Sequence, residues 1–558
     1  MRRASRGPGR AIFAATFVLY LAVGVYLAAG LHVYVGDSLS RVQSAQSVLF
    51  SRDPHLAAIG FIFTPLTAIV QLPLTALTPW WPELTTEAIS AAVMSAAFMA
   101  GSVVQISGVA RDRGLPGWMG GLITVCYAIN PMIVFYGANG MSEAPYLFFL
   151  AWASRRLIRW VDTDDVHELV VAAMALGFGY LTRYDGGAAT MAAALLVGLV
   201  SFRRAEKVGT PPSTRWYRTI LDVGLVVLPS AVAFVGWALT SWLITGNAFA
   251  QFSSEYGNAS IIEQSGGSGS DTTEAALRFS MTELAILAPL FPLLLVAVVV
   301  TRATRRRLYP LLPTVLLIGA VLAFQILSYS RGSTFGFLRF YITVIALAAI
   351  VALLAVPARR TAPVRRPGVY AAMPVVESRR RPVTIMGIAA VVTMLVAIPV
   401  TAWGMTSPKY APQEFALTAV VAPRPDSTER KHLDAQRVLR SFSTERALAQ
   451  YLDSLDLPEG SVLCDTVYGF AVVVASTRPK QFVIPSDQDF TTILNDPAAN
   501  GVQYLLSVPN EGRGSADALN IRYPTLYDNG SQISVLVLEA RNDGANLPDW
   551  RIYRVIPR

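Results

Sequence analysis

Charged side chains are scarce in this sequence of 558 residues. Asp, Glu, Lys and Arg make up only 15% of it, against 53% hydrophobic residues, whereas soluble globular proteins usually carry about 25% charged residues. The shortage is uneven, because apolar runs fill residues 11–402 and 403–558 has the mixed composition of a soluble domain. Several runs approach the roughly 20 apolar residues that cross a bilayer. The composition therefore predicts a polytopic α-helical membrane protein followed by a folded domain.

Cysteine and histidine are also rare. The two cysteines, Cys126 in an apolar run and Cys464 in the soluble part, give no disulfide framework. Of the four histidines, His55 lies in Asp53-Pro-His-Leu-Ala57 without a His or Glu at metal-binding spacing. It fits an exposed loop residue and a substrate contact equally well. No glycine-rich phosphate loop follows a strand-like run.

The net charge of +9 does not indicate nucleic-acid binding, because the basic residues form short clusters between apolar runs. We expect eleven spans, at about 11–31, 87–110, 117–136, 143–158, 167–181, 185–201, 219–244, 283–301, 310–329, 338–356 and 383–402. With the N-terminus inside, the cytoplasmic segments hold 25 Lys and Arg residues and the outer loops six. The pattern predicts a multi-pass plasma-membrane protein with an extracytoplasmic C-terminal domain. The basic start of the chain could instead open a cleaved signal peptide, but its apolar stretch of about 20 residues favours an uncleaved span.

The apolar segment 61–77 needs a separate interpretation. If it crossed the membrane, every later loop would change sides and most basic residues would lie outside. It also contains Pro65, Gln71 and Pro73, and a proline inside a span removes a backbone donor and kinks the helix. We therefore expect it to lie at the outer interface or to be re-entrant. The first outer loop then covers 32–86 and carries interfacial helices.

The C-terminal stretch 403–558 alternates strand-like and helix-like runs. Strands are expected at Ser461–Cys464, Gln481–Ile484, Gln503–Ser507 and Ile533–Leu538, with helices at Glu429–Leu455 and Asp489–Asn495. This alternation is typical of an α/β layer arrangement. The chain is thus expected to have two parts, a membrane domain at 1–402 and an extracytoplasmic α/β domain at 403–558.

Two acidic residues are placed at the outer ends of expected spans. Asp37, four residues before Arg41, follows the first span, and Glu143 begins the fourth. A carboxylate between water and apolar surface can have a raised proton affinity and act as a general base. The alternative is helix capping, which Asp, Ser and Glu perform in the first turn. Both acids fall on the same membrane face, which favours a shared site.

Two further groups of polar residues occur on that face. Arg183, Tyr184 and Asp185 occupy a very short loop, where the alternative role is a local ion pair at the interface. Ser330, Arg331 and Arg339 lie in a loop rich in glycine and hydroxyl groups. Arginine forks bind phosphate in a bidentate manner. Outer arginines are not explained by the positive-inside rule, so we expect Arg331 and Arg339 to bind a phosphate.

This layout resembles the GT-C glycosyltransferases, such as protein O-mannosyltransferases and aminoarabinose transferases. Asp37 matches their first-loop acid, Asp53-Pro-His-Leu-Ala57 with Thr64-Pro-Leu66 resembles the start of the interfacial helix, and Glu143 matches the second acid by position. The same short motifs are similar to those of actinobacterial membrane proteins. Unlike the mannosyltransferases, the chain lacks a paired Asp-Glu in the first loop, so the resemblance assigns no ligand set for a divalent cation and no acceptor.

The resemblance implies transfer of a sugar from a polyprenyl-phosphate donor in the bilayer to an envelope acceptor. Asp37 would be the base and Glu143 would assist, while Arg331, Arg339 and Arg183 would bind the donor phosphate. Substrate contacts are expected from Arg41, His55, Tyr184, Asp185 and Ser330. A transporter or lipid flippase, or a non-catalytic envelope-assembly protein, is the alternative, although no pair of matching interrupted segments occurs in two halves.

Overall fold

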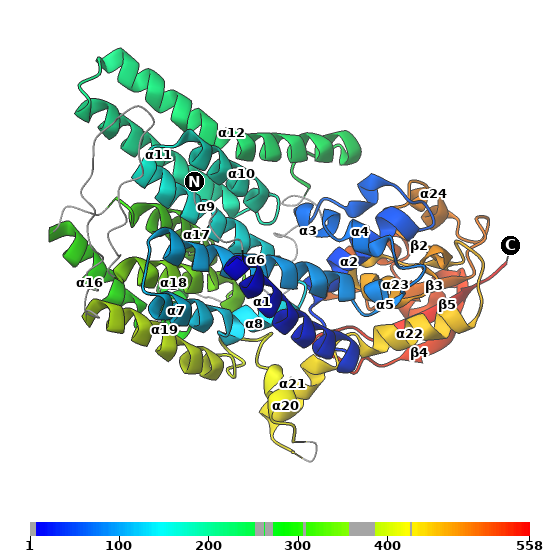
Figure 1. Ribbon diagram of the computed structural model, residues 1–558. Helices are drawn as coiled ribbons and strands as arrows, with labels where there is room; N and C mark the ends of the chain where they lie inside the picture. Colours follow the sequence, from blue (N-terminus) through cyan, green and yellow to red (C-terminus); the bar gives the residue numbers. More distant parts are fainter. Residues whose placement is uncertain are drawn as a thin grey trace.

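The computed structural model describes residues 7–250, 262, 272–304, 309–356, 385–424 and 427–557. A helical bundle forms the larger part, and a smaller α/β domain lies beside one end of it (Figure 1). The bundle helices are α1 (Gly7–Val25, continued by a π-helical turn Tyr26–Gly30), α6 (Ile89–Asp112), α7 (Gly117–Ala128), α8 (Pro131–Ala138), α9 (Glu143–Thr163), α10 (Val166–Tyr180), α11 (Gly186–Lys207), α12 (Pro212–Thr245), α15 (Thr273–Leu287), α16 (Phe291–Thr304), α17 (Leu312–Ser330), α18 (Thr343–Ala355) and α19 (Ile385–Gly404).

Among the described residues, seven helices are long and apolar enough to cross a membrane, and up to nine spans result if two bent pairs count as one span each. The pairs are α7 with α8, bent by 58°, and α15 with α16, bent by 82°. At the first bend Pro131 cannot donate a backbone hydrogen bond, and the Asn130 side chain accepts from Met132 N instead. α9 and α10 are helical where spans were expected, but they do not reach that length and apolarity.

Residues 32–86, which the sequence predicts to form the first outer loop, are built from short helices. These are α2 (Gly36–Phe50), η2 (Leu56–Ile59), α3 (Leu66–Ile69), α4 (Leu72–Thr75) and α5 (Glu83–Thr86). In segment 61–77 the structure has only α3 and α4, each about 6 Å long, so neither helix could cross a bilayer. The loop lies between the bundle and the α/β domain (Figure 1).

The α/β domain contains a five-stranded sheet with the order β2-β1-β3-β5-β4. Its strands are β1 (Val462–Leu463), β2 (Phe482–Val483), β3 (Tyr504–Ser507), β4 (Ser534–Ala540) and β5 (Trp550–Val555). β1 pairs in parallel with β2 and β3, whereas β5 is antiparallel to β3 and β4. The carboxyl ends of the three parallel strands therefore share one edge. Four strands match the sequence expectation, and β5 was not predicted.

The helices of this domain differ in part from those expected from the sequence. The expected helix Glu429–Leu455 is two helices, α21 (Arg430–Leu439) and α22 (Ser443–Ser454), because Phe442 adopts a left-handed backbone conformation with φ +70°. α24 (Phe490–Asn495) lies where a helix was predicted, whereas α23 (Thr466–Ala475) was not predicted. α23 packs against α2 of the first outer loop through Leu39, Val42, Ala471 and Val474.

Candidate functional site

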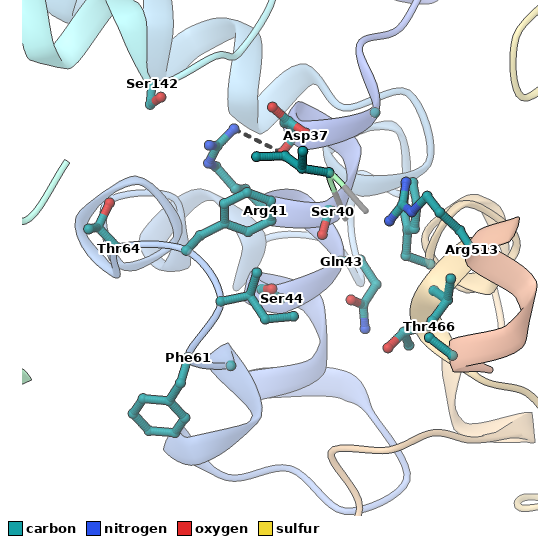
Figure 2. Close-up of a pocket in the computed structure, with 18 of the residues that line it drawn as sticks. Asp37, Ser40, Arg41, Gln43, Ser44, Phe61, Thr64, Ser142, Thr466 and Arg513 are labelled. Atoms are coloured by element: carbon teal, nitrogen blue, oxygen red, sulfur yellow. Dashed lines mark hydrogen bonds between the residues drawn. The ribbon is translucent and has the colours of Figure 1, made fainter. Parts of the chain in front are cut away.

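A large cavity lies between the bundle and the α/β domain. Its volume is about 2580 Å³, and the first outer loop, the loops 141–143, 182–185 and 332–340, and the α/β domain all contribute to its lining. Loops that the charge pattern assigns to one membrane face therefore meet at one place. Figure 2 shows α2 at the centre, with Asp37, Ser40, Arg41, Gln43 and Ser44 projecting from it.

Asp37 and Arg339 form the central ion pair. Arg339 Nη2 donates to Asp37 Oδ2 at 3.0 Å. Arg339 stands in the short helix η3 (Leu338–Tyr341), directly before α18, a helix that is apolar on all sides and buried in the core. This packing fixes the arginine, whose side chain is only 6% exposed, whereas the Asp37 side chain remains 39% exposed to the cavity. One carboxylate oxygen of Asp37 is therefore held while the residue stays accessible.

Arg41 lies one helical turn after Asp37 on α2. Its Nη1 donates to the Asp37 backbone oxygen at 3.0 Å (Figure 2). Its guanidinium also lies over the Phe63 ring at 4.4 Å from the centroid. Arg41 and Arg339 both approach Met141 Sδ, at 3.7 and 3.8 Å. The two guanidinium groups thus border one polar pocket beside Asp37.

Glu143 and Arg183 form a second, more enclosed ion pair. Arg183 Nη1 donates to Glu143 Oε1 at 2.9 Å, and Arg183 Nε donates to Asp185 Oδ1 at 3.2 Å. Glu143 is also 3.9 Å from Arg339 Nε, so the two ion pairs are neighbours. Burial opposes the charge of Arg183, but Asp185 and Glu143 outweigh it and raise the pKa of its guanidinium. Because two carboxylates already hold Arg183, it is better suited to positioning Glu143 than to binding a new anion.

The charges around Asp37 determine its protonation state. Burial raises the pKa of the carboxyl group, but the positive charges of Arg339 and Arg41 more than offset this, and the pKa lies below its usual value. Asp37 is therefore a carboxylate at neutral pH. It can accept a proton from a group that enters the cavity.

A third acid, Glu414, was missed from the sequence. It lies in the connection after α19, is 1% exposed, and accepts a hydrogen bond of 2.5 Å from Tyr136 Oη. Burial raises the pKa of Glu414 above the usual value. Tyr136 lies close enough to Arg339 and Glu143 to interact with their charges. A glutamate in a connecting segment has no sequence signal that would join it to Tyr136, 278 positions earlier in the chain.

The structure brings most of the predicted site residues together. The cavity lining includes Asp37, Arg41, His55, Glu143, Arg183, Tyr184, Asp185 and Arg339. His55 Nδ1 lies 2.7 Å from the Asp53 backbone oxygen, and Tyr184 packs against Phe61 and Trp237.

Ser330 and Arg331 are placed differently. Neither is part of the cavity lining, although the next residues, Gly332 and Ser333, are. Arg331 is exposed at the end of α17, and Ser330 Oγ donates to the Leu327 backbone oxygen. Of the two arginines in this loop, only Arg339 contacts the other charged residues of the site.

The donor set at this site does not suit a divalent cation. Across the residues that the structure describes, no group of three or more His, Cys, Asp or Glu side chains could hold a metal ion. Asp37 and Glu143 are each paired with arginine instead.

No protein-family model matches the chain, and no curated protein sequence matches it. Solved structures do. ArnT from Cupriavidus metallidurans bound to undecaprenyl phosphate aligns over 98% of this chain and 98% of that chain, with 13% identity and a TM-score of 0.56. The same protein in the apo state gives 98% and 97% coverage, 13% identity and a TM-score of 0.54. The apo oligosaccharyltransferase from Archaeoglobus fulgidus covers 89% of this chain and 70% of its own, at 12% identity and a TM-score of 0.37. The likeness to ArnT extends over the bundle and the α/β domain, and it confirms that the chain has the GT-C membrane fold.

Proposed function

We propose that the chain is a membrane glycosyltransferase that moves a sugar from a polyprenyl-phosphate carrier to an acceptor hydroxyl. The observation that carries this proposal is Asp37, an accessible carboxylate held by Arg339 inside a cavity that the bundle and the α/β domain share. The GT-C fold supports it, because ArnT, which has this fold, is described bound to undecaprenyl phosphate. A transporter would not need a lone accessible base at the centre of such a site.

The reaction would be a single displacement. The acceptor oxygen forms a bond to the anomeric carbon, and the bond from that carbon to the phosphate oxygen breaks. The acceptor proton passes to Asp37, and the lipid phosphate leaves with the bonding electrons. Glu143 takes no proton in this scheme. It holds Arg183 and, through the neighbouring Arg339, helps to fix the central ion pair.

Arg339 and Arg41 are assigned to the donor phosphate. Both border Asp37, and neither is neutralised by two carboxylates at hydrogen-bonding distance as Arg183 is. Guanidinium groups aimed at a leaving phosphate stabilise the charge that develops there. Arg331 is not assigned this role, because it lies outside the cavity lining. His55, Tyr184 and Asp185 remain candidates for substrate contacts, because all three line the cavity.

The orientation follows from the charge pattern. We place the N-terminus in the cytoplasm and the cavity with the α/β domain at the outer face of the plasma membrane, where an envelope glycan, lipid or protein would be the acceptor. Reporter fusions after Arg307 and after Trp403 test this. The first should report a cytoplasmic position and the second an outer one, and the reverse result would overturn the assignment.

Transfer from radiolabelled undecaprenyl phosphate sugars, screened in membranes, tests the activity. Comparing Arg339→Gln with Arg331→Gln then tests where the donor phosphate binds. The structure favours Arg339, whereas the sequence also suggested Arg331. We expect Arg339→Gln to raise the KM for the donor by about 10-fold or more, because this is the usual effect of losing a hydrogen bond to a charged group. Arg331→Gln should leave the KM near that of the unsubstituted protein. A larger effect at Arg331 would move the phosphate site to the end of α17.

A further inference from the structure

The α/β domain contributes to the cavity the edge at which its parallel strands end. The segments that follow β1, β2 and β3 all line it. These are the first turn of α23 with Thr466 and Tyr468, the loop with Ser486 and Asp487, and the segment with Pro509 and Arg513. These segments stand at the carboxyl ends of the parallel strands. In open α/β sheets ligands bind in the crevice outside this edge. The position of the domain is therefore one that suits ligand binding as well as covering the site.

Arg513 is the main cation of this edge. Its guanidinium stacks over the Tyr468 ring at 5.5 Å from the centroid. Within the described part of the chain, no Asp or Glu forms an ion pair with Arg513. In contrast, Arg183 pairs with Glu143, and Arg339 pairs with Asp37. The charge of Arg513 reaches Asp37 across the cavity and contributes to its lowered pKa, after burial and the larger effects of Arg339 and Arg41. The guanidinium is thus close to the proposed base and available to an anion.

The loop that carries Arg513 is held firmly. The buried Asn520 side chain donates to the Val508 backbone oxygen at 3.0 Å and to the Gly514 backbone oxygen at 2.8 Å. A Cβ at Gly514 would lie 2.1 Å from the Pro509 backbone oxygen, so the turn closes too tightly for any side chain. Asp465, after β1, accepts from Ala518 N at 2.9 Å and joins this loop to the start of α23. The arginine is therefore preorganised.

The opposite wall of this part of the cavity carries neutral polar groups beside the Asp37 carboxylate. Figure 2 shows Arg513 and Thr466 facing α2, from which Ser40, Gln43 and Ser44 project beside Asp37. Hydroxyl and amide groups of this kind can hydrogen-bond the hydroxyl groups of a sugar. An unpaired arginine on one side and neutral polar groups on the other fit a sugar residue that carries one negative group.

We propose that this edge of the α/β domain is the acceptor subsite, and that Arg513 binds an anionic group, a phosphate or a carboxylate, on the acceptor glycan. The inference rests on the proposed transferase function. It places the donor phosphate at Arg339 and Arg41 and the acceptor's negative group at Arg513, so that the two anions approach Asp37 from different sides. The acceptor hydroxyl attacks from the side of the α/β domain.

Binding measurements on the full chain in lipid nanodiscs test the inference without requiring transfer. The probes are trigalacturonic acid and glucose 6-phosphate, each compared with its uncharged counterpart, galactotriose and glucose. The unsubstituted protein should bind at least one anionic probe about 10-fold or more tightly than its neutral counterpart. Arg513→Gln should reduce this preference to about twofold or less, and Arg513→Lys should retain part of it because the charge remains. The anionic probe that shows the preference identifies the phosphate or the carboxylate.

Arg522→Gln is the matched control. Arg522 also stacks on a tyrosine, Tyr523, at 4.9 Å, but it is exposed and outside the cavity lining. The preference should persist in this variant. Equal binding of charged and neutral probes by the unsubstituted protein, or a preference that survives in Arg513→Gln, would overturn the proposal. Binding of undecaprenyl phosphate should be unchanged by Arg513→Gln, and an equal loss there would assign Arg513 to the donor. If the unsubstituted protein does not bind undecaprenyl phosphate but still prefers an anionic probe, the proposed function is contradicted while the anionic-sugar site stands.

Discussion

The two acids that sequence reasoning could also assign to helix capping do not cap helices. Asp37 lies in the first turn of α2, but Val35 is the N-cap residue there and no side chain caps the helix. The Asp37 carboxylate instead accepts from Arg339, 302 positions later in the chain. Glu143 likewise pairs with Arg183 and not with the backbone of α9. The local ion pair of Arg183 and Asp185, the alternative to a functional role, is present, but Arg183 also pairs with Glu143.

Asp37→Asn should abolish most transfer. The substitution keeps the size of the side chain and a hydrogen-bond acceptor for Arg339, but an amide cannot take the acceptor proton. We expect kcat to fall by about 10²–10⁴-fold with normal amounts of protein in the membrane, measured as transfer from a polyprenyl-phosphate sugar. Asp528→Asn, at an exposed position of the α/β domain outside the cavity lining, is the control. Near-normal activity of Asp37→Asn would move the base to Glu143 or Asp185.

Arg339 should also set the pH range of the reaction. Its positive charge lowers the pKa of Asp37 against the effect of burial, so the carboxylate stays ionised as the pH falls. In Arg339→Gln the arginine charge no longer offsets the effect of burial, so the pKa of Asp37 rises. The acid limb of the pH profile of kcat/KM therefore moves to higher pH. Arg339→Lys, which keeps the charge, should leave the limb close to its original position. If the limb stays in place in Arg339→Gln, Asp37 is not the group that titrates.

At the scale of elements, local patterns predicted more than long-range pairings did. The apolar runs indicated the bundle helices, and alternating runs indicated β1 to β4, because periodicity is a property of neighbouring residues. β5 was missed, and its place in the sheet depends on pairing with β3, whose partner residues lie 44 to 50 positions earlier in the chain. α23 was missed because Thr466–Ala475 is almost wholly apolar, and a short apolar run does not distinguish a buried helix from a strand.

The turn that delivers Glu143 to the site depends on Gly140. This residue has φ +77°, and a Cβ there would lie 2.3 Å from Ser38 Oγ and 2.5 Å from Ala91 Cβ. Gly140→Ala therefore combines backbone strain with a clash against α2 and α6. We expect a loss of about 1–3 kcal/mol of stability, seen as a lower thermal unfolding midpoint in detergent, together with a fall in activity.

Gly187→Ala is a suitable comparison for that test, because a Cβ at Gly187 would meet nothing within 4 Å and the residue lies in helix α11. Alanine favours a helix more than glycine does, by about 1 kcal/mol. The unfolding midpoint of Gly187→Ala should therefore stay level or rise. An unchanged midpoint for Gly140→Ala would show that the turn can relax and does not fix Glu143.

At the scale of the whole molecule, two arginine contacts fasten the α/β domain over the site. Arg446 of α22 donates to Glu87 Oε1 at 2.7 Å and to the Thr86 backbone oxygen at 2.9 Å. Arg52 of the first outer loop pairs with Asp487 and Asp489, which follow β2. Composition predicted that the chain has a soluble part, but these contacts join residues about 360 and 435 positions apart. Their pairing has no local signal, so neither the cavity nor its Arg513 wall could be derived from the sequence.

Burial of Asp487, one of the partners of Arg52, should give the α/β domain a measurable pH dependence. Burial raises the pKa of Asp487 to about 6, although Ile484 N–H and Arg52 oppose this, whereas an unfolded aspartate titrates near about 3.9. Between these values the folded chain holds a proton that the unfolded chain has released, so stability falls as the pH rises from about 4 to about 6. The loss should be on the order of 3 kcal/mol. Asp487→Asn should remove this slope, measured by hydrogen exchange of the segment 484–490 after correction for intrinsic rates.

Asp489→Asn separates this effect from the loss of any partner of Arg52. The Arg52 hydrogen bond outweighs the small effect of burial and lowers the pKa of Asp489. The stability that Asp489 contributes is therefore present above the unfolded pKa of about 3.9 and is lost only as the pH falls below it. Asp489→Asn should keep the slope of stability between about pH 4 and 6. It should weaken the contact with Arg52 throughout this range and at higher pH. If both variants lose the slope equally, the dependence comes from the ion pair as a unit. If neither loses it, the titrating group lies elsewhere in the domain, and burial at the carboxyl end of β2 does not control how firmly the α/β domain covers the cavity.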